Sequence, residues 1–263
     1  MKNIAVVMLI VAGLAGCASS SEPNDETRGW PVEKLYYEAH DELNSGNYTR
    51  SIKLYETLEA RFPYGRYAQQ AQMDLAYAHF KDQEPALALA ACDRFIKLHP
   101  AHANVDYIYY LKGLINYNED GGILAKYTGQ DRAERDPKAA RESYLAFNEL
   151  VTRFPDSKYA PDAREKMTNL VYGLAEHDLF VSRYYMRRGA YIAAANRAQN
   201  MVKEFSDTPF VEEALAIMVT AYDKLGQPQL RDDSKRVLAK NYPNSQYLEK
   251  NWTPRQVPWY QFW

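Results

Sequence analysis

The sequence has little glycine and little cysteine, and it contains no alternating runs rich in valine and isoleucine. Only 12 of its 263 residues are glycine and only 2 are cysteine. Strands favour β-branched residues, and tight hairpin turns favour glycine, so this scarcity argues against a β-rich fold. Long stretches with helical periodicity are present instead. The sequence therefore predicts an all-α protein.

The sequence also has none of the short motifs that mark common enzymes. No P-loop, GxGxxG, GxSxG or HExxH pattern occurs. His99 and His102 flank Pro100, but no cysteine or pair of carboxylates lies near them to complete a metal site. We therefore expect no enzymatic activity, no metal and no bound cofactor. A helical muramidase, which needs one buried acid in a deep cleft, is the enzymatic alternative.

The first seventeen residues, MKNIAVVMLIVAGLAGC, are the one strongly apolar stretch. Lys2 precedes an apolar run from Ile4 to Leu14, which is shorter than the about 20 residues that span a membrane. Because small residues and then Cys17 follow this run, the stretch resembles a bacterial lipoprotein signal. That resemblance implies removal of residues 1–16 and acylation of Cys17 on its sulfur and its new N-terminus. An ordinary secretory signal with an incidental cysteine is the alternative.

Residues 17–31 are predicted to be a flexible tether between lipid and domain. They are small and polar and include two prolines, so they cannot bury a core. Without Lys2, the chain has 31 basic and 34 acidic residues, and this balance does not suggest a nucleic-acid partner. If Cys17 is acylated, Cys92 stands alone and cannot form an intramolecular disulfide. We expect Cys92 to be a small buried hydrophobic residue in the run ALALAACDRFIKL.

Five stops divide the rest of the chain into repeats. At each stop, an amphipathic stretch ends in an aromatic residue or histidine, and this residue is followed by proline or serine. Proline marks the end because it does not continue a helix. Seventeen residues before each stop a turn between helices is expected, with glycine in three of five cases. Large apolar residues recur five positions before the stop, and small residues recur twelve positions before it. The stops are Pro63, Pro100, Pro155, Ser206 and Pro243; the turns are Gly46, Gln83, Lys138, Gly189 and Gly226; the apolar positions are Leu58, Phe95, Leu150, Met201 and Leu238; the small positions are Ser51, Ala88, Ser143 and Ala194, with Arg231 as the exception.

The spacing of the stops identifies the type of repeat. Pro63 to Pro100 and Ser206 to Pro243 are each 37 residues, near the 34 of a tetratricopeptide (TPR) repeat. The sequence therefore predicts an α-solenoid of five TPR-like helix pairs. Repeat three carries an insert, residues 118–137, whose glycines predict a long loop. Repeat four has a long first helix over residues 159–188.

These features predict an N-terminal half, residues 32–157, and a C-terminal half, residues 158–243, followed by an aromatic tail, residues 244–263. Two prolines prevent the tail from forming one continuous helix, and its large aromatic side chains need cover. Either the tail folds back over the last repeat, or it is a short peptide that enters a groove on a partner.

Tyrosine and arginine, which are enriched at protein–protein hot spots, gather in two places. The first helices of repeats one to three line the concave face of a solenoid, where aromatic side chains suit an extended peptide. A second group lies where the long helix ends, and its arginines equally suit the C-terminal end of a helix dipole. The groove candidates are Tyr67, Tyr77, Arg94 and Tyr107; the docking candidates are Arg183, Tyr184, Arg187, Arg188 and Arg197.

Four stretches resemble the BamD (ComL/YfiO) family, lipoproteins of the outer-membrane β-barrel assembly machine. They are RFPYGRYAQQAQMDLAYAHFK, AACDRFIKLHPAHANVDYIYYLKGL, DRAERDPKAARESYLAFNELVTRFPDSKYA and RYYMRRGAYIAAANR. The resemblance covers nearly the whole chain. It implies a non-catalytic scaffold on the periplasmic face of the outer membrane, and the absence of aspartate directly after Cys17 fits that location.

The resemblance also implies the partners. The N-terminal repeats would receive the C-terminal signal of unfolded barrel proteins, and Tyr67, Tyr77, Arg94 and Leu98 lie in the matched segments. The C-terminal repeats would dock the last POTRA domain of the barrel subunit BamA, with Arg197 as a charged contact, together with small lipoproteins of the same complex. A periplasmic TPR lipoprotein for peptidoglycan synthesis or envelope integrity is the alternative. It would share the anchor and the period, but neither the insert nor the long helix.

Overall fold

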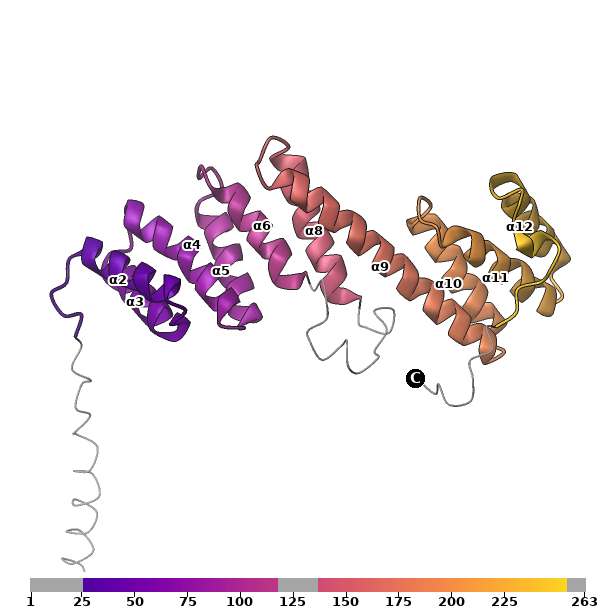
Figure 1. The fold of residues 1–263 in the computed structure, drawn as a ribbon, viewed down its shortest axis with the longest axis horizontal. Coiled ribbons are helices and arrows are strands. Elements are labelled where there is room, and N and C mark those ends of the chain that lie inside the picture. Colours follow the sequence, from indigo (N-terminus) through magenta and orange to yellow (C-terminus); the bar gives the residue numbers. More distant parts are fainter. Residues whose placement is uncertain (1–25, 118–136, 255–263) are drawn as a thin grey trace, which may run out of the picture. The chain divides into compact units, whose positions relative to one another are not determined.

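The structure is a computed structural model that describes residues 26–117 and 137–254 (Figure 1). In these ranges the chain forms helices and no strand, so the all-α prediction is confirmed. The predicted signal peptide, Cys17, residues 118–136 of the insert and the end of the tail lie outside the described residues. None of the described helices is long and apolar enough to cross a membrane. The helices are α2 (Val32–Asn44), α3 (Tyr48–Arg61), α4 (Arg66–Lys81), α5 (Pro85–Leu98), α6 (Val105–Asn116), α8 (Lys138–Arg153), α9 (Ala160–Arg187), α10 (Tyr191–Glu204), α11 (Val211–Lys224), α12 (Pro228–Asn241) and the 3-10 helix η3 (Gln246–Leu248).

The chain divides into two compact units, Met1–Asp74 and Leu75–Trp263. In the first unit, α2 packs on α3. In the second unit, each helix from α5 to α12 packs against the next described helix along the chain. Such sequential packing is typical of TPR-like arrays, so the predicted TPR-like solenoid is confirmed. The predicted halves, residues 32–157 and 158–243, concern function and stay a prediction.

The second helix of every pair ends with the same backbone geometry. The residue after the helix has φ between −132° and −129° and ψ between 43° and 68°. Its N–H donates to the carbonyl four residues earlier, and that earlier residue is fully buried in all five cases. The extended backbone then leads into the residue that ends the predicted stop, which is proline in four pairs. These end residues are Phe62, His99, Phe154, Phe205 and Tyr242.

Four of the five predicted turns have the left-handed backbone that glycine favours. Gly46, Gly189 and Gly226 have φ of 83°, 73° and 66°, and Gln83 has φ of 61° although it carries a Cβ. Lys138 differs, because it is already the first residue of α8. That helix has 16 residues whereas the other four second helices have 14, so it starts two residues earlier.

The helices of a pair approach closely at the predicted small positions. Ser51 Oγ donates to the carbonyl of Ala39 at 2.8 Å, and Ser143 Oγ donates to the carbonyl of Gly113 at 2.8 Å. Both serines are fully buried. A Cβ added to Gly113 would lie 2.5 Å from Cδ1 of Phe147, so only glycine fits there. The small residues therefore set the distance between the two helices of a pair.

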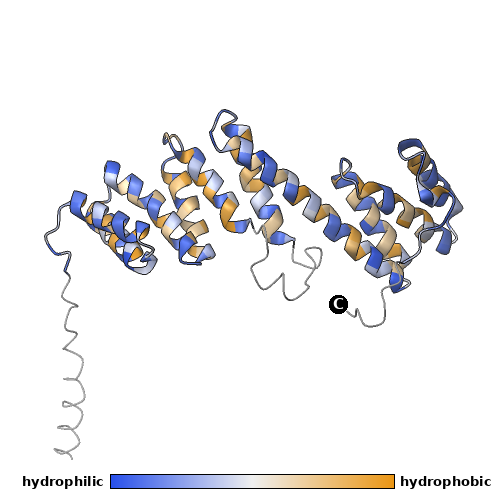
Figure 2. Ribbon diagram, in the orientation of Figure 1, coloured by the Kyte–Doolittle hydropathy of each residue, from blue (hydrophilic) through white to orange (hydrophobic). Residues whose placement is uncertain are grey.

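Helix α9 is the predicted long helix, and its 28 residues confirm the prediction. It packs against both α8 and α10 and also contacts α11. Hydrophobic and hydrophilic residues alternate along its whole length (Figure 2), because different faces of the helix meet different neighbours. The helix therefore joins repeat three to the C-terminal helices within the second unit.

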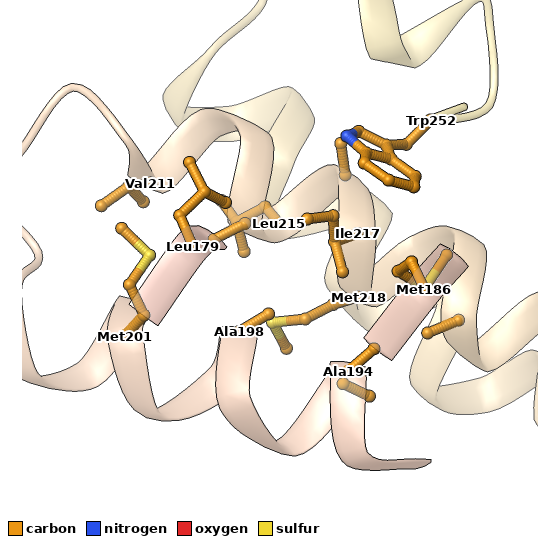
Figure 3. Packing of buried hydrophobic residues seen from close by; sticks show 14 of the residues in the cluster. Leu179, Met186, Ala194, Ala198, Met201, Val211, Leu215, Ile217, Met218 and Trp252 are labelled. Atoms are coloured by element: carbon orange, nitrogen blue, oxygen red, sulfur yellow. The ribbon is translucent and has the colours of Figure 1, made fainter. Parts of the chain in front are cut away.

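Residues 244–254, here called the strap, cover the last repeat. Trp252 is only 5% exposed and belongs to a cluster with Ile217 of α11 and Met186 of α9 (Figure 3). Every residue of α11 from Ala214 to Tyr222 is buried. The described part of the tail thus folds back over the last repeat, as the first of the two alternatives predicts.

Candidate binding surfaces

A tyrosine cluster lies on the first helices of the Met1–Asp74 unit. Tyr36 of α2 is at its centre, with its ring centroid 5.5 Å from that of Tyr37 and 5.4 Å from that of Tyr67 on α4. The guanidinium of Arg66 lies 5.2 Å from the centroid of Tyr67. Tyr37 is 57% exposed, so the cluster has an open aromatic face. Aromatic rings near a guanidinium can hold both apolar side chains and cations of a peptide.

Asp74 of α4 fixes the orientation of this cluster. Its Oδ2 accepts hydrogen bonds from the hydroxyls of Tyr36 at 3.0 Å and Tyr55 at 3.3 Å, and its Oδ1 accepts one from Gln70 Nε2 at 3.0 Å. Burial raises the pKa of Asp74, although these hydrogen bonds act in the opposite direction. Burial, helped by the charge of Asp74, also raises the pKa of Tyr36. The tyrosine hydroxyls therefore stay protonated and continue to donate.

A second tyrosine cluster lies between α6 and α9 in the other unit. The ring of Tyr110 stacks on that of Tyr159 with centroids 4.8 Å apart, and Tyr107 lies 5.7 Å from Tyr159. The hydroxyl of Tyr110 donates to Asp162 Oδ2 at 2.6 Å. Both clusters thus pair an anchored tyrosine with a carboxylate on the first helix of the next repeat.

The five predicted groove residues are divided between these surfaces. Tyr67 belongs to the first cluster and Tyr107 to the second, whereas Tyr77 pairs with Phe80 within α4, with centroids 6.4 Å apart. Arg94 and Leu98 lie one turn apart on the exposed face of α5. The sequence did not single out Tyr159 or Asp74. For Tyr159, its place next to the start of the long helix was the available signal.

Two of the predicted docking residues are engaged in ion pairs inside the chain. Arg183 Nε and Nη2 donate to the two carboxylate oxygens of Glu213 at 2.7 and 2.5 Å. Arg197 Nη2 lies 2.8 Å from Oδ1 of Asp178, whose side chain is only 4% exposed. Burial raises the pKa of Asp178 and the charge of Arg197 lowers it, with burial the larger effect. These two arginines therefore hold α9 against α11 and α10.

The other three predicted docking residues form an exposed surface at the end of α9. We call Tyr184, Arg187, Arg188 and Ile192 the tip patch. Tyr184 is 44% exposed and Ile192 is 64% exposed. The guanidinium of Arg188 lies 5.8 Å from the ring centroid of Tyr184. The patch therefore combines two exposed cations with exposed apolar area, a composition found at protein–protein interfaces.

An open hollow of about 540 Å³ lies between α8, α9 and the end of α10 in the second unit. Its lining includes Tyr144, Tyr172 and Phe205 together with the acids Glu204 and Asp207, and both acids are exposed. The general acid of a muramidase lies in a buried site, whereas these two carboxylates are exposed. Within the described residues, no three His, Cys, Asp or Glu side chains are placed to hold a metal ion.

Comparison with known proteins identifies the family. The family model described as YfiO, outer membrane lipoprotein, matches residues 29–238. The chain belongs to this family. The resemblance of the four stretches above is thereby confirmed.

Relatives in this family match nearly all of the chain. A protein of Neisseria meningitidis is 52% identical over the full length of both chains. Relatives from Xylella fastidiosa and Vibrio cholerae are each 36% identical and cover 95% and 89% of this chain, and 85% and 96% of their own length. All three are named outer membrane protein assembly factor BamD.

Solved structures resemble the chain more distantly. The pilus biogenesis factor PilW matches with a TM-score of 0.37 at 13% identity and covers 83% of this chain and 96% of its own. At this level of similarity nothing about binding transfers to the chain.

Proposed function

We propose that the chain is a non-catalytic scaffold lipoprotein of outer-membrane β-barrel protein assembly. The observation that carries this proposal is the 52% identity, over the full length of both chains, to a protein named as an assembly factor of the outer membrane. The tandem helix pairs agree with it, since such arrays present extended binding surfaces without a catalytic centre. The acids Glu204 and Asp207 in the hollow are exposed, whereas the general acid of a muramidase lies in a buried site.

The N-terminal helix pairs are proposed to bind unfolded barrel proteins. The two tyrosine clusters support this assignment, because each offers aromatic rings held in fixed orientation by a carboxylate. Rigid tyrosine side chains lose little conformational entropy on binding and accept both apolar and polar groups. Tyr67 and Tyr107 are the predicted groove residues that belong to these clusters.

The C-terminal helices are proposed to dock the POTRA domain of BamA, with small lipoproteins of the complex nearby. The tip patch is the best-supported contact, because Arg187 and Arg188 are exposed and make no ion pair within the described residues. Arg183 and Arg197 are proposed to hold the helices that carry this surface in place, since each already neutralises a partly or fully buried carboxylate. Covalent lipid on Cys17 is proposed to hold the scaffold at the periplasmic face of the outer membrane.

The test is co-purification of BamA with charge-reversed variants of the tip patch. We expect Arg187→Glu combined with Arg188→Glu to reduce recovered BamA at least tenfold, because two cations at the interface become anions. Arg197→Glu alone is a weaker test, since it places a second negative charge beside the buried Asp178 and disturbs the α9–α10 contact.

The matched control is Lys203→Glu, an exposed charge reversal in the last turn of α10. It should leave BamA recovery unchanged. Thermal unfolding of all three variants checks that the fold is intact. Full recovery of BamA with the double variant would refute the docking assignment.

A further inference from the structure

The strap ends beside the tip patch. Trp252 Nε1 donates to Glu213 Oε1 at 2.9 Å, and Glu213 in turn accepts both hydrogen bonds of Arg183. The backbone N–H of Trp252 donates to Thr220 Oγ1 at 3.1 Å. Arg187 follows Arg183 by four residues and therefore lies about one turn further along the same face of α9, about 6 Å away along the axis. The last described residues of the chain are thus anchored next to this arginine.

The tip patch has no cover within the described residues. Arg187 and Arg188 are exposed and lack a carboxylate partner there. Ile192 at 64% and Tyr184 at 44% are among the most exposed large apolar side chains of the second unit. An uncovered group of this kind, apolar and cationic together, matches an aromatic segment, because guanidinium groups are attracted to the faces of aromatic rings.

The chain itself supplies such a segment directly after the strap. Residues 255–263 read RQVPWYQFW and contain Trp259, Tyr260, Phe262 and Trp263 with one charged side chain, Arg255. Nine residues reach at most about 30 Å when extended, several times the rise of one helical turn. The segment is therefore long enough to cross the tip patch from its anchor at Trp252.

We propose that residues 255–263 dock on the tip patch of the same chain. Their aromatic rings stack on Arg187 and Arg188 and cover Ile192. A partner that binds this patch must then displace the segment, and this consequence rests on the proposed docking function. While the segment can dock, only a fraction of the chains expose the tip patch to a partner. Removal of the segment should therefore tighten partner binding by about three- to tenfold.

Photocrosslinking tests the docking without any partner. A photoreactive phenylalanine replaces Ile192 in the lipidated full chain in detergent, and trypsin then releases residues 256–263 as one peptide. We expect this peptide to be crosslinked to α10. Leu145, which is 62% exposed on α8, is the matched control position, and it should give at least tenfold less of this product. Arg187→Ala with Arg188→Ala should reduce the Ile192 product at least threefold.

Mixing isotope-labelled and unlabelled chains separates the possible occupants. Crosslinked products in which both peptides are labelled, or both are unlabelled, support docking on the same chain. Mixed-mass products mean that a second copy occupies the patch, and equal yield from Leu145 means unspecific contact; either result overturns the proposal, as does the absence of product.

The partner is then measured separately, with purified BamA POTRA domains and a variant that lacks residues 255–263. Tighter binding by the variant supports displacement of the segment. If the crosslink forms but the deletion leaves the affinity unchanged, the partner binds elsewhere. That outcome refutes the tip patch as the docking site and leaves the intramolecular contact established.

Discussion

Gly113 is the position where the structure makes the most direct prediction about packing. A Cβ at this position would lie 2.5 Å from Cδ1 and 2.7 Å from Cζ of Phe147, whose ring is fully buried. Gly173 in α9 is also helical, but a Cβ there would meet nothing within 4 Å. The same change, glycine to alanine, therefore has opposite consequences at the two positions.

The magnitudes follow from helix propensity and overpacking. Alanine stabilises a helix interior by about 1 kcal/mol relative to glycine, so Gly173→Ala should raise the free energy of unfolding by about that amount. Overpacking of a tight core costs about 1–3 kcal/mol, and contacts this short belong at the upper end. We expect Gly113→Ala to lose about 2 kcal/mol net, a gap of about 3 kcal/mol between the two variants.

Urea unfolding followed by circular dichroism measures both variants against the natural chain. The double variant Gly113→Ala with Phe147→Leu tests the cause, because a smaller side chain leaves room for the new methyl group. The two changes should be coupled by at least about 1 kcal/mol. If Gly113→Ala is as stable as Gly173→Ala, the close approach of α6 and α8 is not what requires glycine.

Two further predictions concern the strap. Trp252→Ala should lower the free energy of unfolding by about 3–5 kcal/mol, because it removes a buried indole and its hydrogen bond to Glu213; urea unfolding measures this, and a loss below about 1 kcal/mol would contradict the buried position. Burial acts to raise the pKa of Glu213, but the hydrogen bonds from Arg183 and Trp252 outweigh it, so this pKa lies below its ordinary value of 4.5. The ion pair therefore stabilises the fold fully above about pH 4.5, and this stabilisation is lost as the pH falls through the lowered pKa. In that pH range the free energy of unfolding of the natural chain should fall more steeply than that of the Glu213→Gln variant. If the melting temperatures of the natural chain and of Glu213→Gln change in parallel with pH, the stabilising role of this ion pair is refuted.

The repeat architecture was predictable because its signals are local. Proline after an aromatic residue ends a helix whatever surrounds it, and glycine favours the left-handed turn, so the stops and turns followed from residue type and spacing. Leu150 and its equivalents were predictable as core residues for the same reason, since they recur at one distance from each stop. Lys138 shows the limit, because the start of α8 depends on the preceding insert, where the 17-residue spacing carries no information.

The roles of the charged residues were not predictable in this way. Arg183, Arg187 and Arg188 look alike in the sequence, but among the residues that the structure describes only Arg183 meets a carboxylate. That carboxylate comes from α11, which is distant in sequence. The tyrosine clusters show the same limit. Asp74 organises Tyr36 across two helices, and no spacing rule joins residues 38 positions apart. Pairings of this kind depend on tertiary packing.

The strap links the stability of the last repeat to the surface that is proposed to bind a partner. The end of a helical array exposes the apolar face that the next repeat would cover, so it needs a cap. Here the cap is the strap, and its anchor, Trp252, is hydrogen-bonded to the same Glu213 that holds Arg183. Arg183 lies one turn before Arg187 of the tip patch. A change that releases Trp252 removes one hydrogen bond to Glu213, although both bonds from Arg183 remain. It also removes the anchor from which residues 255–263 reach the tip patch. Strap variants should therefore lose stability without losing partner binding, whereas Arg188 variants should lose partner binding without losing stability.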